Sequence, residues 1–168
     1  LETIKVQNRQ LQNINWHNQR LNRTRLELFG IGEPLLLENL IEIPNGLNDE
    51  VYKCRVIYSK EVESIEFEKY IPRKISSLKV VESNFIDYSF KFVDRTQLND
   101  LLQRRENCDD ILIVKNGFIT DTSYANIVFW DGQNWLTPST PLLAGTKRAR
   151  LLHESKIKEA EIRVDDLI

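Results

Sequence analysis

Apolar and polar residues alternate in several short stretches of the chain, which is typical of half-buried strands. The alternation at the start predicts a hairpin, and the turn Asn116-Gly117 predicts a second one because this pair suits a tight two-residue connection. Pro72 is expected to end the strand before it. The expected strands lie near residues 1–6, 11–14, 52–58, 62–70, 111–114, 118–121, 127–130 and 135–137.

Four segments have a helical pattern. The first is expected at residues 16–29 with Asn15 as its cap, and a short second helix is expected from Pro34 to Ile41. Two more are expected at residues 96–105 and from Gly145-Thr146 to about residue 158. Many short strands framed by a few helices predict a mixed α+β fold in two lobes, with domains 1–85 and 86–168.

The composition excludes several classes of protein. With 168 residues, 41% hydrophobic, 29% charged and a net charge of −2, the chain is expected to form a globular protein without the basic field that nucleic-acid binding needs. No apolar run approaches the roughly 20 residues that span a bilayer, and the first ten residues do not look like a signal peptide, so a cytoplasmic protein is expected. Two cysteines and two histidines are too few for a disulfide framework or a Cys/His zinc site.

Two residues are candidates for acid–base and nucleophilic chemistry. Lys91 stands in the largely apolar run 88–93, where desolvation would lower its pKa and free the amine for Schiff-base chemistry. The alternative for Lys91 is an ordinary lysine on the outward face of a strand. Asp121 ends a predicted strand and could be held at the mouth of a sheet, or could simply form a turn with Thr122-Ser123.

Two further features could bind an anion. Gly145-Thr146 opens a predicted helix, whose N–H groups and dipole favour negative charge, although most helix starts bind only water or a cap. Arg20, on the first predicted helix, could complete a phosphate clamp or could be a solvated arginine. An imine-forming amine, a carboxylate and an anion site are together what pyridoxal 5'-phosphate (PLP) requires.

The order of these segments resembles the class IV aminotransferases, the PLP enzymes that include branched-chain and D-amino-acid aminotransferases and 4-amino-4-deoxychorismate lyase. The run 115–129, KNGFITDTSYANIVF, is similar to the family signature, and Thr137-Pro138 and the run 143–148, LAGTKR, continue it. His17-Asn18-Gln19-Arg20-Leu21 resembles the family's H-x-x-R-L helix. The run 91–95, KFVDR, is similar to the K-x-x-[ND]-R form of the lyase branch.

The resemblance implies a role for each candidate. Lys91 would form the internal aldimine and later move the Cα proton, Asp121 would pair with the pyridine nitrogen, and Arg20, Gly145 and Thr146 would hold the phosphate. Asn126 is expected to buttress the loop after Asp121. The family usually has Glu in place of Asp121, and its chains generally continue past the last residues here.

The resemblance also implies a two-lobed fold: a small N-terminal α/β lobe and a larger cofactor-binding lobe with a barrel-like sheet whose C-terminal part is short or missing. Because Arg95 follows Lys91 as in the lyase motif, we expect a 4-amino-4-deoxychorismate lyase-like enzyme that acts on a small amino substrate through a Cα carbanion. The alternatives are an amino-acid aminotransferase and a non-catalytic relative. A homodimer is expected, with no nucleic acid, membrane or metal as partner.

Overall fold

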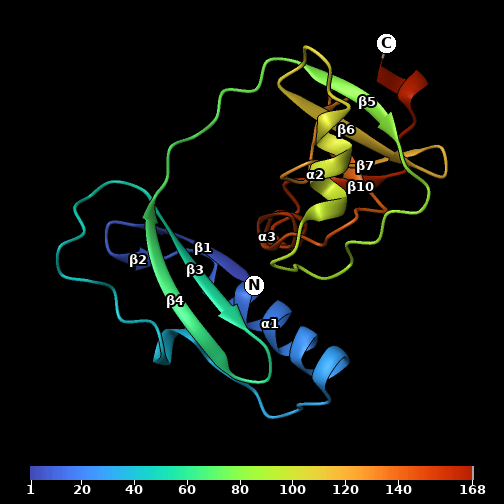
Figure 1. Ribbon diagram of the computed structural model, residues 1–168. Helices are drawn as coiled ribbons and strands as arrows, with labels where there is room; N and C mark the ends of the chain where they lie inside the picture. The colour runs from blue at the N-terminus through green and yellow to red at the C-terminus, as the bar shows by residue number, and fades with distance from the viewer. Residues whose placement is uncertain (168) are drawn as a thin grey trace. The chain divides into compact units, whose positions relative to one another are not determined.

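The computed structural model describes residues 1–167 and divides the chain into two compact units, of which the second begins at Lys74 (Figure 1). The sequence placed the division near residue 85. The difference arises because strand β5 (Leu78–Glu82) pairs in parallel with β6 (Asp110–Lys115), so residues before 85 complete a sheet of the second unit. The mixed α+β class is confirmed.

The first unit contains one antiparallel sheet of four strands in the order β2-β1-β3-β4. The hairpin predicted at the start of the chain is present as β1 paired to β2, and the two strands predicted at 52–58 and 62–70 form the pair β3–β4. The second strand is shorter than expected because helix α1 begins at Ile14. The bounds are β1 Glu2–Gln7, β2 Gln10–Leu11, β3 Tyr52–Tyr58 and β4 Val62–Lys69.

Helix α1 (Ile14–Phe29) follows the hairpin and ends at Gly30, whose φ of 70° and backbone N–H close the last turn. The predicted cap Asn15 is wrong: the cap is Asn13 in a left-handed conformation, without a side-chain hydrogen bond. The helix expected from Pro34 to Ile41 is also wrong, because only the 3-10 turn η1 (Leu37–Asn39) forms.

Side chains of α1 explain the missing second helix. The amide of Asn22 both accepts from the Leu35 N–H and donates to the Leu35 carbonyl, each at 2.8 Å. The Asn18 side chain accepts from the Leu37 N–H at 2.9 Å. The Leu35 carbonyl, which would accept from Asn39 N–H in a helix, is therefore bound to the Asn22 side chain instead, which favours an extended segment.

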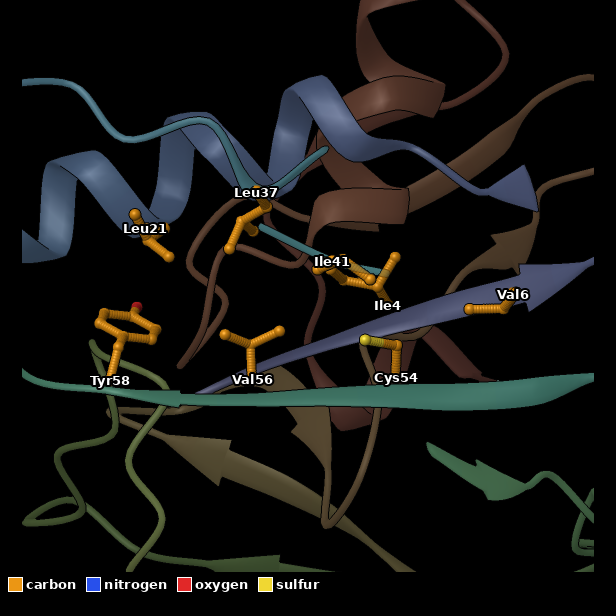
Figure 2. Packing of buried hydrophobic residues seen from close by; sticks show 8 residues of the cluster. All are labelled: Ile4, Val6, Leu21, Leu37, Ile41, Cys54, Val56 and Tyr58. Carbon is orange, nitrogen blue, oxygen red and sulfur yellow. The ribbon is translucent and has the colours of Figure 1, made fainter. Parts of the chain in front are cut away.

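The core of the first unit lies between α1 and the sheet (Figure 2). Leu21 points from the helix toward the sheet, while Cys54, Val56 and Tyr58 point from β3 toward the helix. Leu37 also lies in this cluster and is fully buried. The apolar side of each element therefore faces the other, as the alternation in β3 predicts.

The second unit contains two sheets of three strands, β5-β6-β7 and β10-β9-β8. Helix α2 (Thr96–Gln103) agrees with its prediction. The strand expected at 127–130 is reduced to two residues. The bounds of the other strands are β7 Phe118–Thr122, β8 Phe129–Trp130, β9 Trp135–Pro138 and β10 Lys158–Ala160.

The last helix is shorter than predicted. Helix α3 (Thr146–His153) ends well before residue 158, because Ser155 adopts a φ of 54° and the Lys156 N–H donates back to the Leu151 carbonyl. The chain then turns, and β10, which the sequence did not predict, pairs in parallel with β9. A final 3-10 turn, η2, covers Val164–Leu167.

One apolar cluster of the second unit joins the segments that carry the predicted site. It combines Tyr88, Leu98 of α2, Ile111 and Ile113 of β6, and Leu142 before α3. A separate cluster lies where β6 and β7 meet the chain around β9 and β10. Among residues 1–167, no helix has the length and apolar character needed to cross a membrane.

Candidate active site

Asp121 is a buried carboxylate at the end of β7, with 5% of its surface exposed. Its Oδ1 accepts from the Asn126 side-chain amide at 2.6 Å, and its Oδ2 accepts from the Leu143 N–H at 3.1 Å. Asp121 and Asn126 also form an isolated antiparallel bridge. Asp121 is therefore fixed by two segments that lie on either side of it.

Burial raises the pKa of Asp121 from 3.8 to about 6. Hydrogen bonds from Asn126 and Leu143 and the charge of Arg148 act in the opposite direction but offset only part of this effect. A cation placed beside such a buried carboxylate would stabilise its charged form and lower its pKa. Each carboxylate oxygen can accept more than one hydrogen bond, so such a cation could also donate to it.

The segment before α3 is connected to Asp121 through Asn126. The Asn126 amide donates to the Leu143 carbonyl at 2.8 Å and accepts from the Gly145 N–H at 3.1 Å. A Cβ at Gly145 would fall on the Asn126 carbonyl oxygen, so this position has room only for glycine. Thr146 is half-buried and is the first residue of α3. The expectation that Asn126 buttresses the loop agrees with these contacts.

Lys91 lies in the loop between β5 and α2, not on a strand. The expected apolar enclosure is wrong: Lys91 is only half-buried, and its neighbours Phe92 and Val93 are 42% and 53% exposed. The apolar residues of this run therefore do not form a buried strand. Tyr88, in contrast, is buried, and its hydroxyl donates to the Phe92 carbonyl at 2.9 Å, which closes the loop around Lys91.

Arg20 belongs to the first unit and is not the solvated arginine that its helix position allowed. Its Nε and Nη2 donate to the two carboxylate oxygens of Glu2 at 2.9 and 2.6 Å. His17 Nδ1 lies 2.6 Å from Glu2 Oε2. Although burial acts to raise the pKa of Glu2, the bonds from His17 and Arg20 outweigh it and lower that pKa.

Sequence reasoning gave no role to three buried polar residues, Glu2, His17 and Arg148. His17 is buried against Glu2. Arg148 is buried in α3 and donates to the Pro138 carbonyl and to Glu159. The sequence offered one indication of the cluster around Glu2: this residue falls at an inward-facing position of β1, and a buried carboxylate needs cationic partners.

The predicted site residues fall into two groups. Asp121, Gly145 and Thr146 are joined through Asn126, and Arg95 joins the Lys91 loop to them by donating to the Ser123 carbonyl. Arg20 forms its own buried cluster in the first unit. The surface hollow of the first unit, between the 34–40 segment and the start of β4, is lined by none of the predicted residues.

Comparisons with known proteins show which proteins the chain is similar to in sequence and in fold. An uncharacterized protein of Haemophilus influenzae is 38% identical over 99% of this chain and 90% of its own length. A solved structure of a "putative 4-amino-4-deoxychorismate lyase" from Haemophilus somnus has a TM-score of 0.90 at 35% identity, with 99% of this chain and 88% of that chain covered.

A more distant structure shows the same fold. It is "a hypothetical aminotransferase from Mycobacterium tuberculosis" in its α-ketoglutarate and PMP bound form, with a TM-score of 0.81 at 18% identity over 99% of this chain and 72% of its own. The family model described as "Amino-transferase class IV" matches residues 1–168. The chain is a member of the class IV aminotransferase family.

Proposed function

We propose that the chain is a PLP-dependent enzyme of the 4-amino-4-deoxychorismate lyase type. Membership of the class IV family and the similarity to the Haemophilus somnus protein support this assignment. The observation that carries it is the buried Asp121 carboxylate, whose pKa is raised by burial and which is held by Asn126 and Leu143, with no salt bridge to it among residues 1–167. A protonated pyridine nitrogen is the group that such a carboxylate would stabilise.

The residues present fit PLP. When bound, PLP supplies an aldehyde for an amine and an electron-withdrawing ring that stabilises negative charge at the substrate Cα. Asp121 would hold the proton on the ring nitrogen, and it retains the charge of the family's usual Glu with one methylene less. The start of α3 around Gly145 and Thr146 would hold the phosphate by hydrogen bonds from its backbone N–H groups.

Lys91 would be the amine that holds the PLP aldehyde and the general base that takes the proton from the substrate Cα. The Tyr88 hydroxyl, which donates to the Phe92 carbonyl, would keep the backbone next to Lys91 in place for this role. In the lyase reaction, the substrate then loses pyruvate and becomes 4-aminobenzoate.

The first experiment tests cofactor binding. The purified protein is incubated with PLP, its absorbance near the visible edge is recorded, and borohydride is added to fix the adduct. We expect a yellow protein that bleaches, with the pyridoxyl group on the Lys91 peptide. Lys91→Ala should stay colourless, whereas the exposed-lysine control Lys158→Ala should behave as the wild type. A colourless wild type would instead identify a non-catalytic relative.

The second experiment tests the reaction. The protein with PLP is mixed with 4-amino-4-deoxychorismate, and separately with amino acids plus 2-oxoglutarate. Release of pyruvate and 4-aminobenzoate from the first mixture is the expected result. Turnover of the second mixture alone would contradict the lyase assignment and identify an aminotransferase.

A further inference from the structure

Arg95 connects the two loops that carry Lys91 and Asp121. It directly precedes α2, and its side chain is half-buried. Its Nη2 donates to the backbone carbonyl of Ser123 at 2.6 Å. Because Ser123 lies just beyond Asp121, this hydrogen bond ties the end of the Lys91 loop to the turn that follows β7.

The same guanidinium also lies over one aromatic ring from each loop. Its central carbon is 5.9 Å from the ring centre of Tyr88 and 5.8 Å from that of Tyr124. Tyr88 precedes Lys91, and Tyr124 follows Asp121. A planar guanidinium stacks on rings and donates from its edge at the same time, which a lysine ammonium cannot do.

Tyr88 transmits this contact to the backbone next to Lys91. Its ring is buried in the apolar cluster with Leu98 of α2, and its hydroxyl donates to the Phe92 carbonyl at 2.9 Å. Its ring also meets the Phe92 ring edge-on, with centres 6.3 Å apart. Lys91 lies between these two residues in the chain, so the position of its backbone depends on Tyr88.

We propose that Arg95 is a positioning residue that sets where Lys91 lies relative to Asp121 by holding their two loops together. The consequence for cofactor chemistry rests on the proposed function, whereas the coupling of the loops does not. Arg95 acts through the Ser123 carbonyl and the rings of Tyr88 and Tyr124. Both its planar shape and its charge are therefore required.

Amide hydrogen exchange measures the coupling in the protein without cofactor. Two hydrogen-bonded amides report on the two loops: Phe92 N–H, which donates to the Phe90 carbonyl, and Thr122 N–H, which donates to the Ala125 carbonyl, each at 3.0 Å. In Arg95→Met, both amides should exchange about tenfold faster or more, because a charge-assisted hydrogen bond and two ring contacts are lost. Arg95→Lys should restore only part of the protection.

Arg104→Met is the matched control. Arg104 closes the other end of α2 and also donates to a distant backbone carbonyl, that of Glu82 at 3.2 Å. Its loss should leave the amides of Phe92 and Thr122 unchanged. Faster exchange at only one of the two amides in Arg95→Met, or full protection in Arg95→Lys, would overturn the proposal.

Reductive trapping with PLP supplies the second readout. The pyridoxyl group fixed on Lys91 is measured against that on the exposed Lys158 of the same sample. In Arg95→Met the ratio should fall about tenfold. A wild type that does not label Lys91 would refute the proposed function, and the exchange data would still decide whether Arg95 couples the loops. Efficient labelling of Lys91 in both proteins would refute the positioning role.

Discussion

The side-chain amide of Asn126 donates to Asp121 Oδ1 across 2.6 Å and thereby links the end of β7 to the start of α3. The same side chain accepts from the Gly145 N–H and donates to the Leu143 carbonyl, so all of its polar atoms are used by these two segments. A carboxylate and a helix start that are far apart in sequence are thus held in one arrangement by one asparagine.

Gly145→Ala should disrupt this arrangement. The added methyl would fall on the Asn126 carbonyl oxygen, which would break the bond to the Gly145 N–H and displace the donor to Asp121. We expect a loss of about 1–3 kcal/mol in the free energy of unfolding, measured with urea, and weaker PLP binding. The control is Gly46→Ala, where no atom lies near the new Cβ and no loss is expected. Equal stability of the two variants would contradict this account.

The stability of the protein should depend on pH through Asp121. Its pKa is about 6 in the folded protein against 3.8 in a free chain, so the folded state binds the proton more tightly. This tighter proton binding stabilises the folded state; the contribution is fully present below pH 3.8 and is lost as the pH rises to about 6. The difference in pKa corresponds to a change on the order of 3 kcal/mol.

Asp121→Asn isolates this contribution from that of the other carboxylates. The unfolding free energy of the wild type minus that of the variant should fall between pH 4 and pH 6.5 and stay level above this range. With saturating PLP the decline should shrink, because a cationic ring nitrogen would lower the pKa of Asp121. A difference that rises over the same range would show that the sign is wrong.

Local sequence patterns predicted most of the regular elements because periodicity and turn residues act locally. The β3–β4 pair and α2 agree with prediction. The failures lie where distant side chains determine the backbone. Residues 34–41 do not form a helix because Asn22 of α1 binds the Leu35 carbonyl, and β10 forms only because β9 is beside it.

The candidate site shows the same limit. Motif order placed Asp121 and Gly145 in one family pattern, but only the fold shows that Asn126 holds both. The run around Lys91 left open whether the lysine is desolvated or exposed, because the residue types alone do not reveal that Phe92 and Val93 are largely exposed. Similarly, the motif around Arg20 predicted a bound anion as its partner, whereas the fold shows that Arg20 pairs with the Glu2 carboxylate.

Glu2→Gln should destabilise the first unit strongly. Glu2 has no exposed surface, and its carboxylate compensates the charge of Arg20, whose side chain is 10% exposed. Removing one partner of a buried ion pair costs about 3–5 kcal/mol. The matched control is Glu27→Gln, which breaks only the exposed pair with Arg23 and should change stability by less than about 1 kcal/mol.

The pH dependence of this pair has the opposite sign to that of Asp121. Because the pKa of Glu2 is lowered on folding, its contribution is present above the pKa of the unfolded chain and is lost as the pH falls through the folded value. The stability advantage of the wild type over Glu2→Gln should therefore shrink in acid. A constant advantage across the acid range would mean that the Glu2 charge is not what stabilises the unit.

Arg20 can be tested as a phosphate ligand separately from its bond to Glu2. Arg20→Met alone would leave the buried Glu2 carboxylate without this cation, so the informative comparison is the double variant Glu2→Gln/Arg20→Met against Glu2→Gln. The measurement is the ratio of the Kd for pyridoxal to the Kd for PLP, because only PLP carries the phosphate. If Arg20 binds the phosphate, the ratio should fall about tenfold or more in the double variant, since a charge-assisted hydrogen bond is worth about 1.5–3 kcal/mol. If both affinities change by the same factor, Arg20 only supports the fold.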